Sequence, residues 1–261
     1  MRADAIYLEE QRLQEIDTIS DYQQFHERHR IFPAIFEDRS HKKILDTSAG
    51  VGVLGKRIMA NYDAELLCND ICPKCLDTMG KTGLSTVSFD IDNADKPFPF
   101  ENKSFDAVIS LATIEHVIHI DQYMKEIRRI LNDDGYLYIS APNYNGLAYL
   151  LPLLLTGKTF HCPLTEPDRY EFYAHVRYFT FRSLLEYVST FGFRAETVYL
   201  ALPESSTRFR QLKEKSKMKA HMFRQGMKLL YGISPRWASE PVICFRKSAL
   251  GENAKPRVVI C

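Results

Sequence analysis

Short segments rich in β-branched and apolar residues recur through the first half of the chain, with centres about 20 to 30 residues apart. The segments are Lys43–Thr47, Ala64–Asn69, Ser85–Phe89, Phe105–Leu111 and Tyr136–Ala141. Each interval leaves room for one helix, and strands that alternate with helices build right-handed βαβ units. The sequence therefore predicts an α/β fold with a doubly wound, mostly parallel sheet that helices cover on both faces.

Two of the expected helices carry boundary signals. The first has apolar residues at helical spacing, namely Ile120, Met124, Ile127 and Leu131. Asp121 is its predicted N-cap, and Gly135 follows its end. The second helix is expected to begin at Thr180 and to end at Gly192.

Composition excludes several other classes of protein. Lys and Arg number 34 against 33 Asp and Glu, so the overall charge does not favour nucleic acid as a partner. Six irregularly spaced cysteines are too few for a disulfide scaffold. The charged N-terminus lacks the apolar core of a secretory signal, and the longest uncharged apolar run, Leu147–Leu155, is too short to span a bilayer. We therefore expect a cytoplasmic protein with no transmembrane segment.

The segment from Ile44 to Gly55 is the most informative for chemistry. A predicted strand ends at Asp46 and runs into a turn with Gly50 and Gly52, after which a helix begins. Glycines suit such a turn because a ligand can approach backbone that carries no Cβ. The start of the helix adds free amides and the positive end of its dipole.

Polar residues also follow the next predicted strands. Asp70 ends the second strand, Asp90 ends the third, and Glu115 and His116 follow the fourth. A carboxylate at the second strand can accept both hydroxyls of a ribose, and one at the third can reach an adenine edge. The ligand crevice of an open α/β sheet lies at these carboxyl ends, so the four positions together predict a nucleoside-binding site.

The acid at Asp46 distinguishes two cofactor types. A nicotinamide-binding fold opens its glycine fingerprint directly at the strand end, whereas here the first glycine comes four residues after Asp46. A carboxylate beside the turn repels a pyrophosphate but suits an ammonium group and a sulfonium centre. This favours S-adenosyl-L-methionine over NAD.

Taken together, these motifs resemble those of a known family. They are the D-x-x-x-G-x-G of Asp46–Gly52, the acids Asp70 and Asp90, the EHV of Glu115–Val117, GYLYISAPN, and HVRYFTFRSLLEYVSTFGF. Over about Lys43–Lys247 the chain resembles a class I S-adenosylmethionine-dependent methyltransferase, of the small-molecule group that includes the ubiquinone-biosynthesis O-methyltransferases. The resemblance implies the Rossmann-like methyltransferase fold: seven strands, mostly parallel, with an antiparallel last strand at Glu240–Lys247.

The resemblance also implies roles for individual residues. Gly50 and Gly52 would lie against the methionine part of the cofactor, with Asp46 supporting its amino end. Ser48 stands where the group usually has glycine, and a serine fits there if its φ is not positive.

Asp70 would hold the ribose hydroxyls, and Ile71 would pack on the adenine face. Asp90 would accept from the adenine amino group, with the Ile91 amide nearby. Leu111 would lie under the methionine chain.

Two histidines are the candidate catalytic residues if the acceptor is a hydroxyl, because a base then assists the reaction. His116 lies just past the fourth strand and is the first candidate, and His175 is the second. A packing role remains the alternative for each. No metal is expected: the Cys72–Cys75 pair has no second C-x-x-C, and only His161 and Cys162 could complete a zinc set.

The predicted organisation has three parts: an N-terminal helical segment at 1–40, a methyltransferase domain at 41–248, and a tail at 249–261. Within the domain, a lid-like apolar segment is expected at about 143–175, with core packing or shallow membrane contact as alternatives. A basic helical insertion is expected at about 204–236. It is either a solvated face or a site for an anionic acceptor, lipid headgroups or nucleic acid, with specific nucleic-acid readout disfavoured.

The sequence as a whole favours a methyltransferase that acts on a small-molecule acceptor, lipid-like or sugar-linked, at oxygen rather than nitrogen or carbon. Two alternatives stay open: a non-catalytic binding module with the same fold, and a methyltransferase of RNA or protein. Peripheral membrane contact is compatible with the sequence, and no feature indicates the oligomeric state.

Overall fold

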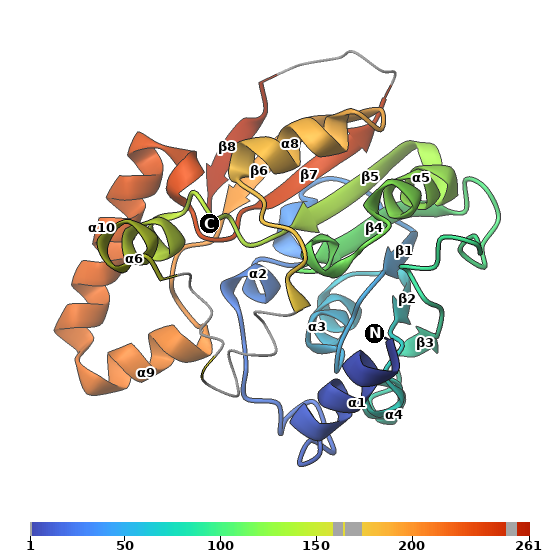
Figure 1. Cartoon of the computed structure of the whole chain (residues 1–261), viewed down its shortest axis with the longest axis horizontal. Coiled ribbons are helices and arrows are strands. Elements are labelled where there is room, and N and C mark those ends of the chain that lie inside the picture. Colours follow the sequence, from blue (N-terminus) through green and yellow to red (C-terminus); the bar gives the residue numbers. More distant parts are fainter. Residues whose placement is uncertain (1, 159–163, 165–173, 249–254) are drawn as a thin grey trace.

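The computed structural model describes residues 2–158, 164, 174–248 and 255–261 (Figure 1). One sheet of eight strands forms its centre, in the order β3-β2-β1-β4-β5-β7-β6-β8. The strands are β1 (Lys43–Asp46), β2 (Glu65–Asn69), β3 (Ser85–Val87), β4 (Phe105–Leu111), β5 (Leu131–Ser140), β6 (Phe193–Leu200), β7 (Val242–Lys247) and β8 (Arg257–Ile260).

Strand direction agrees with the predicted fold. Every pair from β3 through β5 is parallel, whereas β7 lies antiparallel between β5 and β6. The expected antiparallel insertion of the strand near Val242–Lys247 beside the fifth strand is therefore confirmed. The sheet has eight strands rather than seven, because residues 257–260 of the predicted tail pair in parallel with β6.

Helices cover both faces of the sheet (Figure 1). The described helices are α1 (Arg2–Arg12), α2 (Glu27–Arg30), α3 (Val53–Asn61), α4 (Pro73–Lys81), α5 (Ile120–Ile130), α6 (Leu147–Thr156), α8 (Phe181–Ser189), α9 (Thr207–Lys215) and α10 (Lys217–Ile233). Short 3₁₀ turns are η1 (Ala34–Phe36), η2 (Ile114–His116) and η3 (Pro235–Trp237).

Successive residues of the central strands point to two different cores. Val108 of β4 packs in the core under α5 and α8, whereas its neighbours Ala107 and Ile109 pack in the core under α3 and η1. Ile44 and Leu45 of β1 divide in the same way. Burial on both faces explains why these strands read as continuous apolar runs.

Some boundaries differ from the predicted ones. His119 rather than Asp121 occupies the N-cap position of α5. The chain passes from α5 directly into β5 at Leu131, so Gly135 lies inside a strand instead of after a helix. Thr180 caps α8 as predicted, and Gly192 follows that helix with a φ of +71°.

The N-terminal segment is only partly helical. α2 is a single turn, although Phe25, His29, Phe32 and Phe36 stand at helical spacing along the sequence and the last of them lies in η1. Phe32 and Phe36 are nonetheless fully buried and pack edge-on against Tyr138 of β5. The apolar spacing therefore marked the buried residues correctly although the backbone leaves the helix.

The described part of each predicted insertion is mostly helical. α6 begins the lid-like segment and has no buried residue, so its leucines do not pack as core. α9, α10 and η3 occupy the predicted basic insertion. Residues 159–163 and 165–173 of the lid-like segment, with His161 and Cys162, lie outside the described residues. Among the described helices, none is long and apolar enough to cross a membrane.

Candidate active site

The glycine turn after β1 is held by two carboxylates. The Ser48 amide donates to Asp46 Oδ1 at 3.3 Å, and the Gly50 amide donates to Asp70 Oδ2 at 2.9 Å. Gly50 has a φ of +55°, and a Cβ there would meet no atom within 4 Å. Gly50 thus presents bare backbone toward open space, as the sequence predicts for a ligand-facing turn.

Gly52 is glycine for a different reason. Its φ is +86°, and a Cβ there would meet Leu84 Cδ1 and Met79 Cγ at 2.7 Å each. It stands at the N-cap of α3 and brings the helix start close against Met79 of α4 and Leu84, the residue before β3. Ser48 has no positive φ, so the departure from the family's usual glycine causes no strain here.

Asp46 and Asp70 lie close enough to affect each other's charge. Burial raises the pKa of Asp46 to about 7, and the charge of Asp70 adds to the rise while the Ser48 amide opposes it. Burial also raises the pKa of Asp70 to about 6, against the amides of Cys72 and Gly50. Two desolvated carboxylates side by side favour a cationic ligand that would restore their ionised forms.

Asn69, which the sequence analysis did not select, joins three strand ends. Its Nδ2 donates to the Thr47 carbonyl at 2.8 Å, and its Oδ1 accepts from the Phe89 amide at 2.9 Å. Asn69 is buried at the end of β2. The sequence did carry a signal for Asn69, since it is a polar residue at the end of a buried strand, but the binding role was predicted for the adjacent Asp70.

Asp90 lies farther from its strand than predicted. β3 ends at Val87, so Asp90 belongs to the loop beyond it, where its Oδ1 accepts from the Asp92 amide at 2.9 Å. Ile91 is partly buried against the core beneath α5. The Asn69 bond to Phe89 holds this loop at the same end of the sheet as Asp46 and Asp70.

Asp92 connects the loop after β3 to the turn after β4. Its Oδ1 accepts from the Ile118 amide at 3.0 Å and from the His119 amide at 2.7 Å. These amides lie at the start of α5, where a carboxylate is favoured by the helix dipole. Hydrogen bonds therefore connect the successive loops at the carboxyl ends of β1 to β4, from the glycine turn to the turn that carries His116. We call this edge of the sheet the rim.

Tyr123 shows that the ends of β1 and β4 share one region. Its hydroxyl lies 2.8 Å from both Thr47 Oγ1 and Ser110 Oγ. Burial raises the pKa of Tyr123, and the charges of Asp46 and Glu115 add to the rise. Leu111, at the end of β4, is buried against the neighbouring core as expected for a residue beneath the site.

The two candidate bases lie together. The rings of His116 and His175 pack edge-on with centroids 4.7 Å apart. His116 Nδ1 donates to the Ala174 carbonyl at 3.0 Å, and His175 Nδ1 lies 3.1 Å from the Tyr144 hydroxyl. Because a carbonyl only accepts, the neutral His116 ring carries its proton on Nδ1 and keeps Nε2 as the basic nitrogen.

The backbone around Glu115 fixes that arrangement. The Glu115 carbonyl accepts from the amides of Val176 and Arg177 at 3.0 and 3.2 Å. The Arg177 side chain donates from Nη2 to the Ile118 carbonyl at 2.6 Å. Arg177 thus serves a structural contact here, and the segment that begins at Ala174 is docked on η2.

The same place has the composition of a possible cation site. Among the described residues, one donor atom each of Glu115, His116 and His175 lies within 4.8 Å of the others. Glu115 is almost fully buried, and its Oε1 is 3.9 Å from His116 Nε2. Imidazole and carboxylate suit a divalent metal, so the expectation of no metal stays a prediction.

The N-terminal helix supports the glycine turn, a contact that the sequence analysis did not anticipate. Leu13, directly after α1, is 1% exposed and packs in a small cluster with Val51, Cys72 and Cys75. Val51 lies between the two glycines, and Cys72 follows Asp70 by two residues. The segment 1–40 therefore forms part of the wall behind the carboxylate pair.

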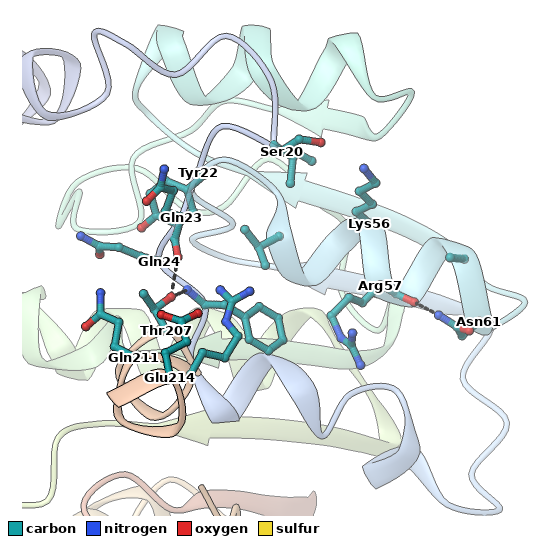
Figure 2. A pocket seen from close by; sticks show the side chains of 15 residues that line it. Ser20, Tyr22, Gln23, Gln24, Lys56, Arg57, Asn61, Thr207, Gln211 and Glu214 are labelled. Atoms are coloured by element: carbon teal, nitrogen blue, oxygen red, sulfur yellow. Dashed lines mark hydrogen bonds between the residues drawn. The ribbon is translucent and has the colours of Figure 1, made fainter. Parts of the chain in front are cut away.

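A cavity of about 720 Å³ opens elsewhere, between residues 19–25, α3 and α9 (Figure 2). The Thr207 hydroxyl joins α9 to the segment 19–25: it accepts from the Phe25 amide at 2.9 Å and donates to the Gln23 carbonyl. None of the predicted site residues lines it. It is a separate groove behind α3 rather than the carboxylate-lined rim.

Comparison with solved structures supports the fold. Phosphoethanolamine N-methyltransferase 2 from Haemonchus contortus, solved with S-adenosyl-L-methionine, matches with a TM-score of 0.54 and 18% identity over 85% of this chain and 52% of that chain. At this identity the likeness shows the fold alone. The strand order and rim together define the class: S-adenosylmethionine-dependent methyltransferases of the class I fold, for which S-adenosyl-L-methionine is the methyl donor.

Sequence comparison identifies the family. The profile of the family described as "Methyltransferase domain" matches residues 14–198, and the chain belongs to that family. A ubiquinone/menaquinone biosynthesis C-methyltransferase of Bartonella henselae is 32% identical over 109 residues, 40% of each chain. A ubiquinone biosynthesis O-methyltransferase of Xanthomonas oryzae is 25% identical over 120 residues, 45% of this chain and 50% of that one. The matches thus span half or less of the curated relatives' length.

The site fits the methyl donor of the class. The open space at Gly50 leaves room for close approach to the backbone, and the paired carboxylates Asp46 and Asp70 match the ammonium and sulfonium charges and the ribose hydroxyls.

Proposed function

We propose that this protein transfers a methyl group from S-adenosyl-L-methionine to a hydroxyl of a small, lipid-like or sugar-linked acceptor. The observation that carries the proposal is the place and tautomer of His116: it lies just past the end of β4, and its Nδ1 donates to the Ala174 carbonyl, so Nε2 is the proton-accepting nitrogen of the neutral ring. The names of the matched relatives, which include ubiquinone-biosynthesis methyltransferases acting at carbon and at oxygen, support a small-molecule acceptor.

The residues of this chain divide the work of binding. Asp46, Ser48, Gly50 and Gly52 would hold the methionine end, above Leu111. Asp70 and Ile71 would hold the ribose and adenine face, and Asp90 with the Ile91 amide would hold the adenine edge. Bound there, the sulfonium supplies a methyl group that is already activated, so the protein mainly has to align the acceptor and exclude water.

His116 would then remove the proton of the acceptor. As the acceptor oxygen takes the methyl group that the bound sulfonium would supply, leaving the neutral thioether, the hydroxyl proton would pass to His116 Nε2. His175 would orient the neighbouring ring through the edge-on contact at 4.7 Å. A base in this position contributes about 10²- to 10⁴-fold to the rate.

Two variants test binding and chemistry separately. Asp70→Ala should abolish the heat of S-adenosylhomocysteine binding in calorimetry. His116→Asn retains a side-chain amide that can donate to the Ala174 carbonyl but has no counterpart of Nε2. We expect it to bind cofactor normally and to lose about 10²- to 10⁴-fold in kcat on a hydroxyl acceptor.

The control is His221→Asn, an exposed histidine on α10, which should retain full turnover. Full activity of His116→Asn would refute the base assignment and leave the cofactor site standing. No binding heat with the wild-type protein would instead favour a non-catalytic module. A steep fall of acceptor affinity with salt would favour RNA as the acceptor.

A further inference from the structure

Four apolar side chains of α10 form an exposed stripe. Met218, Met222, Leu229 and Ile233 are between 65% and 70% exposed. At 100° per residue they fall within an arc of about 60° on the helix surface. The buried residues of the helix, Ala220 and Tyr231, lie on the opposite side and face the protein. The apolar stripe is therefore the outward face of the helix.

Basic side chains flank this stripe. Lys217 and Lys228 lie beside it on one side and Lys219 on the other, and all three are exposed. α9, the helix directly before α10 in the chain, adds four exposed basic residues: Arg208, Arg210, Lys213 and Lys215. The stretch 207–233 holds eight basic residues and one acid in a chain of net charge +1. The rest of the chain therefore carries a net charge of about −6, so positive charge is concentrated on these two helices.

α6 extends the apolar surface at the same end of the molecule. Leu154 and Leu155 are 70% and 79% exposed, and no residue of α6 is buried. The start of α6 lies against the segment that follows α10, because a Cβ at Gly146 would meet the Ala238 carbonyl at 3.0 Å. Figure 1 shows α6, α9 and α10 gathered at the end opposite β3 and α4.

We propose that the outward stripe of α10, with the basic side chains of α9 and α10 and the leucines of α6, binds the surface of a bilayer that contains anionic lipids. A long helix with an apolar face bordered by lysine lies in the bilayer interface, with its apolar side chains below the headgroups. Lysines beside the stripe then meet the phosphates, and the negative remainder of the protein points away from the membrane.

Charge decides between this occupant and a second copy of the chain. A symmetric contact through α10 would bring Lys217, Lys219 and Lys228 of both copies together, and like charges at such an interface oppose association. An anionic surface would not cause that repulsion, and each lysine would strengthen the binding electrostatically. The bilayer is therefore the partner that both the apolar and the charged observations favour.

Vesicle co-sedimentation of the full chain tests the proposal. We expect binding to mixed phosphatidylcholine–phosphatidylglycerol vesicles, much weaker binding to phosphatidylcholine alone, and a fall of binding with salt. Met222→Glu should weaken binding about tenfold or more, because it removes an inserted side chain and adds a negative charge. Lys217→Gln and Lys228→Gln should each weaken it about fivefold.

Matched controls separate the surface from general effects. Met59→Glu changes a methionine of α3 that is 48% exposed, and Lys125→Gln changes an exposed lysine of α5. Both should bind vesicles as the wild type does. All five substituted positions are exposed, and S-adenosylhomocysteine binding verifies that each variant is folded.

Three outcomes would overturn the proposal: no binding to anionic vesicles, equal binding to neutral ones, or unchanged binding of Met222→Glu. Light scattering tests the alternative, that a second copy of the chain binds the stripe. A wild-type dimer that Met222→Glu converts to a monomer, without vesicle binding, would assign the stripe to a second copy instead.

Discussion

Asp46 is the residue whose ionisation most affects the site. Its pKa of about 7 and that of Asp70 near 6 reflect carboxylates that lose solvation without gaining a cation. The bound cofactor would supply the missing positive charge and would lower both pKa values. Proton binding and cofactor binding therefore compete in the pH range just below neutrality.

The affinity for S-adenosyl-L-methionine should consequently fall as the pH falls from 8 to 5.5, by up to about tenfold per pH unit for each carboxylate that takes up a proton. Calorimetry at a series of pH values measures the slope. Asp46→Asn should bind more weakly at pH 8 and show a flatter profile. A wild-type affinity that is constant between pH 5.5 and 8 would contradict the carboxylate assignment.

The same substitution has the opposite effect on the free protein. Because the folded pKa of Asp46 is above its unfolded value, the native state holds more protons between pH 4 and 7, and stability falls as the pH rises through that window. Asp46→Asn should raise the free energy of unfolding at pH 8 by roughly 1–3 kcal/mol. Urea unfolding of both proteins at pH 8 checks the sign.

The cluster of Glu115, His116 and His175 supports a third prediction at the scale of single residues. The sulfonium is activated without a metal, and in the proposed function His116 would supply the base, so dialysis against a chelator should change turnover by less than about twofold. Mass spectrometry for metals before and after dialysis provides the control. Activity lost on chelation and restored by one divalent cation would assign the cluster to a metal.

Among the elements, α1 has a testable role in supporting the glycine turn. Leu13→Ala should cost about 2 kcal/mol where it packs on Val51 and Cys72, and should weaken cofactor binding several-fold because the turn loses its support. Hydrogen exchange over residues 2–13 and calorimetry measure the two effects. Leu8→Ala, at a position 47% exposed, should change neither. Unaltered cofactor affinity in Leu13→Ala would show that α1 only covers the turn.

At the scale of elements, apolar runs predicted the strands well because burial on both faces leaves a strong signal. β4 has the predicted bounds, and β7 is antiparallel as expected. β8 was missed because its Val258 and Val259 follow a charged stretch and pair only with the distant β6. The end of α5 was misplaced because Gly135 resembles a helix stop, whereas tertiary pairing draws Leu131 into β5.

At the scale of the whole molecule, the sequence predicted which strand ends carry the site residues, but it could not predict the contacts between those residues. Asp46 ends β1 and Asp70 follows β2, its parallel neighbour in the sheet, and the charge of Asp70 raises the pKa of Asp46. The end of β2 marked Asn69 as a polar residue, but not its bonds, and nothing in the sequence marked Asp92, because both roles depend on which backbone groups fold toward them. His116 and His175, 59 positions apart, meet only because the chain returns after α6 to dock on η2.

That docking has a wider consequence. Two amides bonded to the Glu115 carbonyl fix the relative positions of both imidazoles without using any side chain that would have to touch an acceptor. Substitutions in α6, α9 or α10 can change which acceptor binds and leave the two histidines and the Glu115 carbonyl in place. A lineage built on such a scaffold can exchange one substrate for another while both histidines keep their places.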